Sequence, residues 1–280
     1  MFASITIKKL RIMRLLWILT LLFAMSLATF GQAAAFAKAD LSQAEVDKIV
    51  AKFTRNERLF RQALNIYAFN RNATVQTIAM GGQITGTYKR DSFMTFDAGG
   101  NRIEKILFFP ISTLTEISIS QADIENLGGL DPFAIEPSQI DKYKFTYLGK
   151  EKIDELDLFV FDVAPKVIPK AEKDGLRLFS GRIWVDDQDF LIVKSKGKAV
   201  PEWKDERFPT IETWRENVDG KYWFPSYSAS DDELVFRSGQ VVKMKVRVRY
   251  SNYGVGRTDI KIIGEEEDVP TPAPVPVKKP

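Results

Sequence analysis

The most regular pattern in the chain is an alternation of apolar and basic residues near its C-terminal end. The apolar positions are Val242, Met244, Val246, Val248 and Tyr250. Their spacing of two predicts a β-strand over residues 241–250 with one buried face. The positions between them are all basic: Lys243, Lys245, Arg247 and Arg249. Such a row suits a solvated face that resists edge-to-edge aggregation. It also suits docking of an acidic partner or of lipid head groups.

Shorter runs of β-branched and aromatic residues predict further antiparallel strands. Residues 84–90 and 92–96 are read as two separate strands, and residues 156–163, apolar on both faces, as a central strand. Asp219-Gly220 between two such runs favours a tight hairpin turn. Taken together, the runs predict about eleven strands.

Two capping boxes predict helices. Ser42-Gln43-Ala44-Glu45 precedes apolar residues that recur at helical spacing as far as Tyr67, which predicts one long amphipathic helix. Ser120-Gln121-Ala122-Asp123 predicts a second helix of about two turns, as a lid over a cavity or as an ordinary connection. The predicted fold class is mainly β with α: an open, strongly curved antiparallel sheet, or half barrel, covered by the long N-terminal helix and the short lid helix.

The two ends of the chain differ from this middle part. Four basic residues between Lys8 and Arg14 precede an apolar run and the small-residue exit Ala35-Phe36-Ala37. This is the pattern of a cleaved secretory signal peptide over residues 1–37, with an uncleaved membrane anchor as the alternative. Residues 265–280 are acidic and then proline-rich, which predicts a disordered tail or a spacer. The folded domain is therefore expected over residues 38–264.

Composition excludes several kinds of chemistry. The chain has no His and no Cys, so the commonest general base, thiol catalysis and the usual zinc ligands are missing. Removing the four basic residues of the acid-free signal from a net charge of +3 gives 3 − 4 = −1, and a nucleic-acid partner is not expected. We predict no metal, no cofactor and no catalytic residue, hence a protein that is not an enzyme. Carboxylate chemistry of the glycosidase type stays open, because acidic residues are many.

Aromatic residues are concentrated on the predicted strands. Side chains of this kind line ligand pockets more often than they catalyse, although they can also fill an ordinary core. We interpret the inward strand faces as the wall of an apolar hollow. The candidate ligand-binding residues are Phe93, Phe108, Phe145, Phe159, Phe161, Trp184, Phe190, Trp214, Trp223, Phe236, Met244 and Val246. The basic row Lys243, Lys245, Arg247 and Arg249 is the candidate docking surface for a partner.

Three segments resemble strand–turn elements of periplasmic outer-membrane lipoprotein-sorting proteins, the LolA-like and LolB-like family. They are residues 143–149, residues 181–193, in which Trp184 precedes an acidic turn, and residues 218–225. The resemblance covers roughly residues 40–262. The chain departs from the family at Asp154-Glu155, where the family often has Asp-Gly, and no residue here can be matched to the lid arginine of the family.

This resemblance implies an open barrel with a helical lid. It also implies a periplasmic carrier that binds lipoprotein acyl chains or lipid in a hydrophobic cavity for transfer towards the outer membrane. Because the family includes sensors of envelope stress, the alternative is an envelope sensor or scaffold that binds an inner- or outer-membrane protein. In both cases we expect a monomer in the periplasm.

Overall fold

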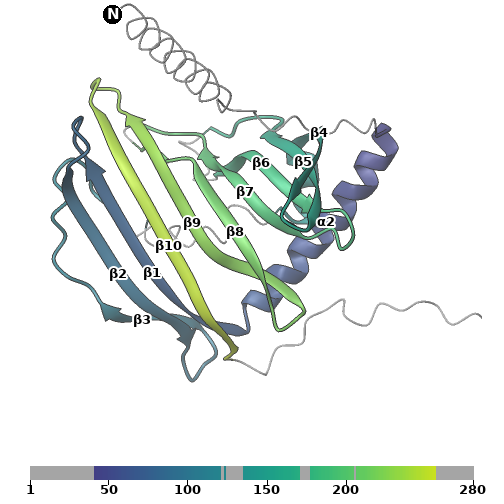
Figure 1. Ribbon diagram of the computed structural model, residues 1–280, viewed down its shortest axis with the longest axis horizontal. Helices are drawn as coiled ribbons and strands as arrows, with labels where there is room; N and C mark the ends of the chain where they lie inside the picture. The colour runs from purple at the N-terminus through teal and green to yellow at the C-terminus, as the bar shows by residue number, and fades with distance from the viewer. Residues whose placement is uncertain (1–40, 121–122, 124–134, 171–176, 205, 257–280) are drawn as a thin grey trace, which may run out of the picture. The chain divides into compact units, whose positions relative to one another are not determined.

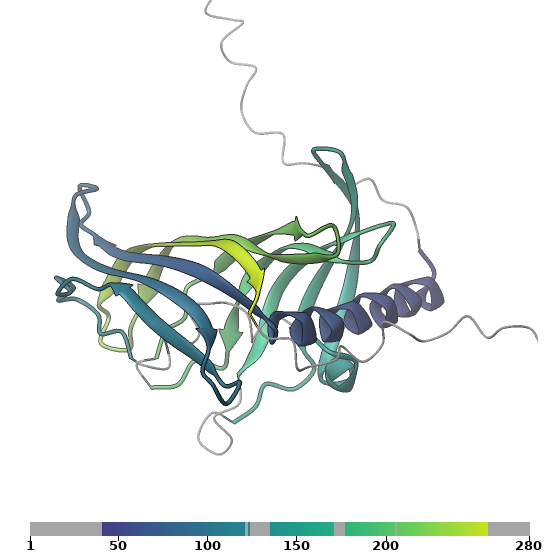
Figure 2. The same ribbon diagram turned by 90° about the horizontal axis from the view of Figure 1, so that it is seen from below.

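The computed structural model describes residues 41–120, 123, 135–170, 177–204 and 206–256. Contacts within the chain separate two units, Met1–Ala37 and Lys38–Pro280, and the fold is that of the second unit. It consists of one ten-stranded antiparallel sheet with a long helix, α2, across one face (Figures 1 and 2). The predicted signal peptide and tail lie outside the described residues.

The first and last strands pair with each other in the middle of the sheet. Across the sheet the order is β3-β2-β1-β10-β9-β8-β7-β6-β5-β4, so the edges are β3 and β4. The strands are β1 Tyr67–Ile78, β2 Ile84–Phe96, β3 Arg102–Phe108, β4 Tyr143–Ile153, β5 Leu156–Pro165, β6 Leu178–Asp186, β7 Ile192–Val200, β8 Ile211–Val218, β9 Tyr222–Val235 and β10 Val241–Val255. A short 3-10 helix, η1 Pro137–Lys142, precedes β4.

Helix α2 (Gln43–Leu64) begins where the sequence predicts it. The Ser42 hydroxyl accepts from the Glu45 N–H, and the Glu45 carboxylate accepts from the Ser42 N–H at 2.8 Å, which completes the capping box. The helix ends at Leu64, earlier than the apolar spacing indicates. Tyr67 instead opens β1, where it pairs with Val255 and packs on Phe224 with ring centroids 4.9 Å apart. Strand pairing therefore overrides the helical pattern at this point.

The sheet has fewer strands than predicted because two runs are one strand. Asp91, which separates residues 84–90 from 92–96, stays in the ladder and pairs with Asn72 and Phe108. The doubly apolar run 156–163 is also not central, since β5 is next to the edge strand β4. Its outer side is buried because Trp184 lies opposite Val160 on the same face. The open sheet with a long helix across it is nevertheless the predicted fold class.

Two apolar clusters occupy the inner face, which we define as the face that α2 covers. The first joins the C-terminal end of α2, including Phe60, to β1, β2, β9 and β10. The second joins the N-terminal half of α2, including Phe53, to β4, β5, β6 and β7. Between them lies a buried polar strip formed by Thr54, Glu57, Ser195, Thr213, Arg215, Ser228 and Ser230. Helix α2 thus contacts apolar side chains at both ends and polar ones in its middle.

The connection from β3 to β4 joins opposite edges of the sheet. Its described part follows β2, where the Thr113 N–H donates to the Thr87 carbonyl at 3.0 Å, and Leu114 packs against the first cluster. A Cβ on Gly86 would lie 2.7 Å from the Thr113 carbonyl oxygen. The close contact between β2 and the connection at Thr113 therefore requires glycine at position 86.

The second predicted capping box is also formed. Ser120 N–H donates to the Asp123 carboxylate at 2.8 Å, and Asp123 N–H donates to the Ser120 hydroxyl at 3.1 Å. The rest of the predicted lid helix, which the sequence ends at Gly128-Gly129, lies outside the described residues. Within the described ranges, no helix combines the length and the apolar character that crossing a bilayer requires.

Candidate functional site

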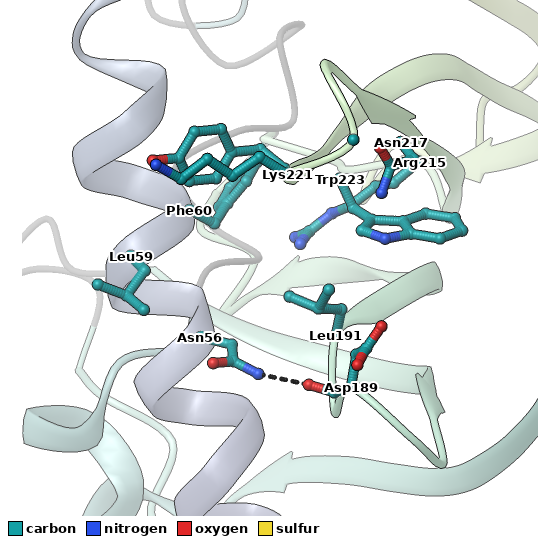
Figure 3. A pocket seen from close by; sticks show the side chains of 11 residues that line it. Asn56, Leu59, Phe60, Asp189, Leu191, Arg215, Asn217, Lys221 and Trp223 are labelled. Atoms are coloured by element: carbon teal, nitrogen blue, oxygen red, sulfur yellow. Dashed lines mark hydrogen bonds between the residues drawn. The ribbon is translucent and has the colours of Figure 1, made fainter. Parts of the chain in front are cut away.

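A cavity of about 320 Å³ opens between α2 and the sheet where β7 and β8 separate (Figure 3). The two strands pair only between residues 194–197 and 211–214, and β8 continues beyond the last pair to Val218. The lining residues are Asn56, Leu59, Phe60, Asp189, Leu191, Arg215, Asn217, Gly220, Lys221, Tyr222 and Trp223. The volume is at the lower end of the roughly 300 to 1,000 Å³ that ligand pockets occupy.

Three elements place apolar side chains around this opening. Leu59 and Phe60 come from α2, Leu191 follows the β6–β7 turn, and Trp223 belongs to β9. Figure 3 shows Leu59 and Leu191 on opposite sides of the opening. The exposed rim carries one carboxylate, Asp189, and one ammonium group, Lys221. The cavity therefore combines apolar walls with a polar mouth, as small-molecule sites commonly do.

A buried ion pair joins α2 to β8 beside the cavity. Two Arg215 guanidinium nitrogens donate to the two Glu57 carboxylate oxygens at 2.6 and 2.9 Å. The side chains are 1% and 6% exposed for Glu57 and Arg215, respectively. The guanidinium also lies over the Phe60 ring, 4.2 Å from its centroid. This bidentate pair fixes the middle of α2 on the polar strip.

A second polar contact holds α2 at the cavity mouth. The Asn56 side-chain amide donates to the backbone carbonyls of Asp189 and Phe190 at 2.8 and 3.0 Å. The turn itself is shaped by the Asp186 carboxylate, which accepts from the Asp189 N–H at 2.7 Å. Lys52 stands over the Phe190 ring at 4.0 Å. These contacts lie at the partly exposed mouth of the cavity, where water can replace the hydrogen-bonding partners.

The candidate ligand-binding residues fall on both faces of the sheet. Those in or against the inner clusters are Phe145, Phe159, Phe161, Phe190, Phe236, Met244 and Val246. They pack on each other and on α2; for example, Phe161 lies 6.1 Å from Phe53 and 5.4 Å from Tyr147 between ring centroids. In these places the inner face is packed instead of hollow, because α2 inserts its own aromatic side chains.

Of the remaining candidates, Trp223 lines the cavity. The others face away from α2 or lie at an edge of the sheet. Trp184 and Trp214 both pair with Lys194 on the outer face, and its ammonium lies 4.7 and 4.2 Å from their rings. Phe93 lies on the same outer face in β2, since its partner Asn70 neighbours the inward Phe69. Phe108 is half exposed at the end of edge strand β3. Period-two spacing alone could not say which face was inward.

The basic row of β10 faces outward, as its alternation with buried residues predicts. Acidic residues of the neighbouring β9 accompany it: Lys243 pairs with Glu233 at 2.9 Å and Arg247 with Asp231 at 2.6 Å. The Arg249 guanidinium lies over the Tyr227 ring at 5.3 Å. The acidic residues of β9 therefore balance part of the positive charge of this basic row. Partner docking at the row stays a prediction.

Glu57 and Arg215 were missed from the sequence. The available signal was a carboxylate at position 57, between Phe53 and Phe60 on the apolar stripe of the helix. A charge in such a stripe needs a partner, because burying it alone is costly. The partner lies 158 residues away, which no local pattern identifies.

A second buried group of charges lies on the inner face near edge strand β3. Glu104 accepts from Arg71 at 2.7 Å, from two nitrogens of Arg90 at 2.9 and 2.7 Å, and from the Ser92 hydroxyl at 2.5 Å. The hydrogen bond from Arg90 is the main reason why the pKa of Glu104 falls to about 2. Among the described residues, no group of three or more carboxylates is placed to hold a metal ion.

No protein-family model matches the sequence, and no curated protein matches it. The fold is similar to solved structures at low identity. A DUF1329 family protein from Desulfovibrio piger is 14% identical, with 75% of this chain and 95% of that chain covered and a TM-score of 0.36.

Two further solved structures are similar over comparable lengths. A LolA superfamily protein from Nitrosomonas europaea is 16% identical, with 73% and 94% of the two chains covered and a TM-score of 0.30. An outer membrane lipoprotein-sorting protein domain from Vibrio parahaemolyticus is 12% identical, with 73% and 93% covered and a TM-score of 0.31. All three TM-scores are below 0.5.

Proposed function

We propose that this protein is a carrier without catalytic activity, which holds the hydrocarbon chain of a lipid or lipoprotein between α2 and the inner face of the sheet. The observation that supports it most is the cavity beside Leu191, whose apolar walls belong partly to the sheet and partly to a helix held by polar contacts. Transfer of apolar surface from water gives about 0.8 kcal/mol per buried methylene, so uptake needs no chemical step.

The cavity alone accommodates only the beginning of a long acyl chain. A longer chain requires α2 to move away from the sheet, which would present Phe145, Phe159 and Phe161 of the second cluster to the ligand. In this account α2 is the cover of the binding site. Opening separates Glu57 from Arg215 and exchanges the aromatic contacts of α2 for contacts with the ligand, in the manner of a lid that closes over a bound molecule.

The sequence supports the same class of function and its place in the cell. The absence of His and Cys removes the commonest catalytic groups. The signal-peptide pattern of residues 1–37 favours export, and the resemblance of residues 143–149, 181–193 and 218–225 to lipoprotein-sorting proteins favours acyl chains as the ligand. We therefore place the carrier in the periplasm.

The test is binding of a fluorescent long-chain fatty acid analogue to the unit Lys38–Pro280. We expect saturable binding that unlabelled long-chain fatty acid displaces. Leu191→Asp should weaken binding about tenfold or more, because it places an unpaired carboxylate in the apolar wall. Val167→Asp is the matched control, since Val167 is 78% exposed and does not line the cavity.

Two outcomes would contradict this proposal. One is the absence of saturable probe binding by the unsubstituted protein. The other is equal weakening by Leu191→Asp and Val167→Asp, which would assign binding to a nonspecific apolar surface. Thermal unfolding of each variant shows whether the fold is intact.

A further inference from the structure

Exposed apolar side chains gather at one end of the sheet. In an antiparallel sheet every second connection lies at the same end, so the β1–β2, β5–β6, β7–β8 and β9–β10 connections share an end. Apolar residues in or beside these connections are Met80, 98% exposed, Val167, 78%, Ile168, 61%, Val235, 58%, Ile84, 57%, and Val241, 52%. Single exposed apolar residues are ordinary, but a group of them marks an interaction surface.

The turns at the opposite end of the sheet are rich in acidic residues. Its β2–β3, β4–β5, β6–β7 and β8–β9 turns contain Asp97, Asp154, Glu155, Asp187, Asp189 and Asp219. By contrast, the β1–β2 turn, residues 79–83, has no charged residue, and the β9–β10 turn, residues 236–240, has only Arg237. The β7–β8 connection, at the same end as the apolar residues, carries both acidic and basic residues, Glu202 and Glu206 beside Lys204 and Arg207. The acid-free, apolar character therefore belongs to the β1–β2 and β9–β10 turns.

The two acid-free turns are side by side. Ile78 of β1 pairs with Lys243 of β10, and Val241 pairs with Val235, so the β1–β2 and β9–β10 hairpins run out together (Figure 1). Each turn is closed by a backbone hydrogen bond, Ala79 N–H to the Gln83 carbonyl at 2.8 Å and Phe236 N–H to the Gln240 carbonyl at 2.9 Å. The two tips form one apolar edge with defined geometry.

Basic residues border this apolar edge. Lys243 is two residues beyond Val241 in β10, Lys245 follows on the same face, and Arg237 lies in the turn. Lys243 pairs with Glu233, but both side chains are about half exposed, 46% and 54%, so this pair can exchange for another anion. An apolar edge with basic residues behind it is the arrangement that binds the interface of an anionic bilayer.

We propose that this end of the sheet docks on the surface of a bilayer containing anionic phospholipids. Met80, Val235 and Val241 enter the head-group region, and Arg237, Lys243 and Lys245 contact lipid phosphates. The opposite end, with the mouth of the cavity near Asp189, then faces away from the membrane. The docking surface is separate from the cavity and does not depend on the function proposed for it.

The test uses the unit Lys38–Pro280 and sedimentation with phospholipid vesicles. We expect binding to vesicles of phosphatidylethanolamine with phosphatidylglycerol and weaker binding to phosphatidylcholine alone. Val241→Glu should lower the partition coefficient about tenfold. Val255→Glu is the matched control, because Val255 lies in the same strand, is 55% exposed and stands at the opposite end of the sheet. The partition coefficient of Val255→Glu should stay within about twofold of that of the unsubstituted protein.

Failure of the protein to sediment with either kind of vesicle would overturn the proposal, and would leave a protein as the partner of this surface. Equal losses in Val241→Glu and Val255→Glu, or equal binding to both kinds of vesicle, would also overturn it. Leu191→Asp should bind vesicles like the unsubstituted protein. Vesicle binding and probe binding can therefore fail independently.

Discussion

Glu57→Ala should lower the free energy of unfolding by about 3 kcal/mol or more. The substitution leaves the Arg215 guanidinium buried without its carboxylate, and breaking one side of a buried pair typically costs about 3 to 5 kcal/mol. Burial of both side chains and two short hydrogen bonds place this pair in that class. Urea unfolding followed by tryptophan fluorescence measures the change directly.

Two controls separate loss of the pair from loss of packing. The double substitution Glu57→Leu with Arg215→Met removes both charges and should recover most of the lost stability, because apolar replacements of buried pairs are often neutral or better. Glu233→Ala, which breaks the exposed pair with Lys243, should cost about 1 kcal/mol or less. If Glu57→Ala cost no more than Glu233→Ala, the pair would not hold α2 on the sheet.

Glu104→Gln should produce the second large loss of stability, on the order of 3 kcal/mol at neutral pH. Gln cannot balance two guanidinium groups, and the side chains of Arg71 and Arg90 are only 5% and 11% exposed. Ser92 would keep a hydrogen-bonding partner, so the loss is chiefly electrostatic.

The same substitution should change how stability depends on pH. The pKa of Glu104 is lowered from 4.5 to about 2, chiefly by Arg90, so the native state favours the ionised carboxylate. Its contribution is present above about pH 4.5 and is lost as pH falls towards 2. The unsubstituted protein should therefore lose roughly 2 kcal/mol more than Glu104→Gln between pH 5 and pH 2. Parallel losses in the two proteins, measured by urea unfolding across that range, would assign the acid sensitivity to other groups.

Local sequence signals predicted the elements that depend on neighbouring residues. The capping box at Ser42 forms because its two hydrogen bonds involve residues three apart. The apolar–basic alternation of β10 places Val246 inward and Lys245 outward, as period two requires. The predicted fold class was also right, because a helix with one apolar stripe has to cover the apolar face of a sheet.

Features that depend on distant pairing were not predictable in the same way. Tyr67 matched the helical spacing, but Val255 and Phe224 hold it in the sheet. Trp184 and Trp214 matched a cavity wall by composition, whereas strand register places both beside Lys194 on the outer face. The cavity itself exists because β7 and β8 stop pairing at residue 194, a local irregularity with no signal in the sequence.

The most direct test of the account is to join α2 to the turn that it contacts at the cavity mouth. The chain has no cysteine, so Asn56→Cys with Asp189→Cys gives the only two thiols. The two positions are close, because the Asn56 side-chain amide donates to the Asp189 carbonyl at 2.8 Å. A short bifunctional maleimide then links helix and sheet, and the same protein capped with N-ethylmaleimide at both positions controls for added bulk. We expect the capped protein to bind the fatty acid probe and the linked protein to bind it at least about tenfold more weakly. Equal affinity in the two forms would show that the ligand does not need α2 to separate from the sheet.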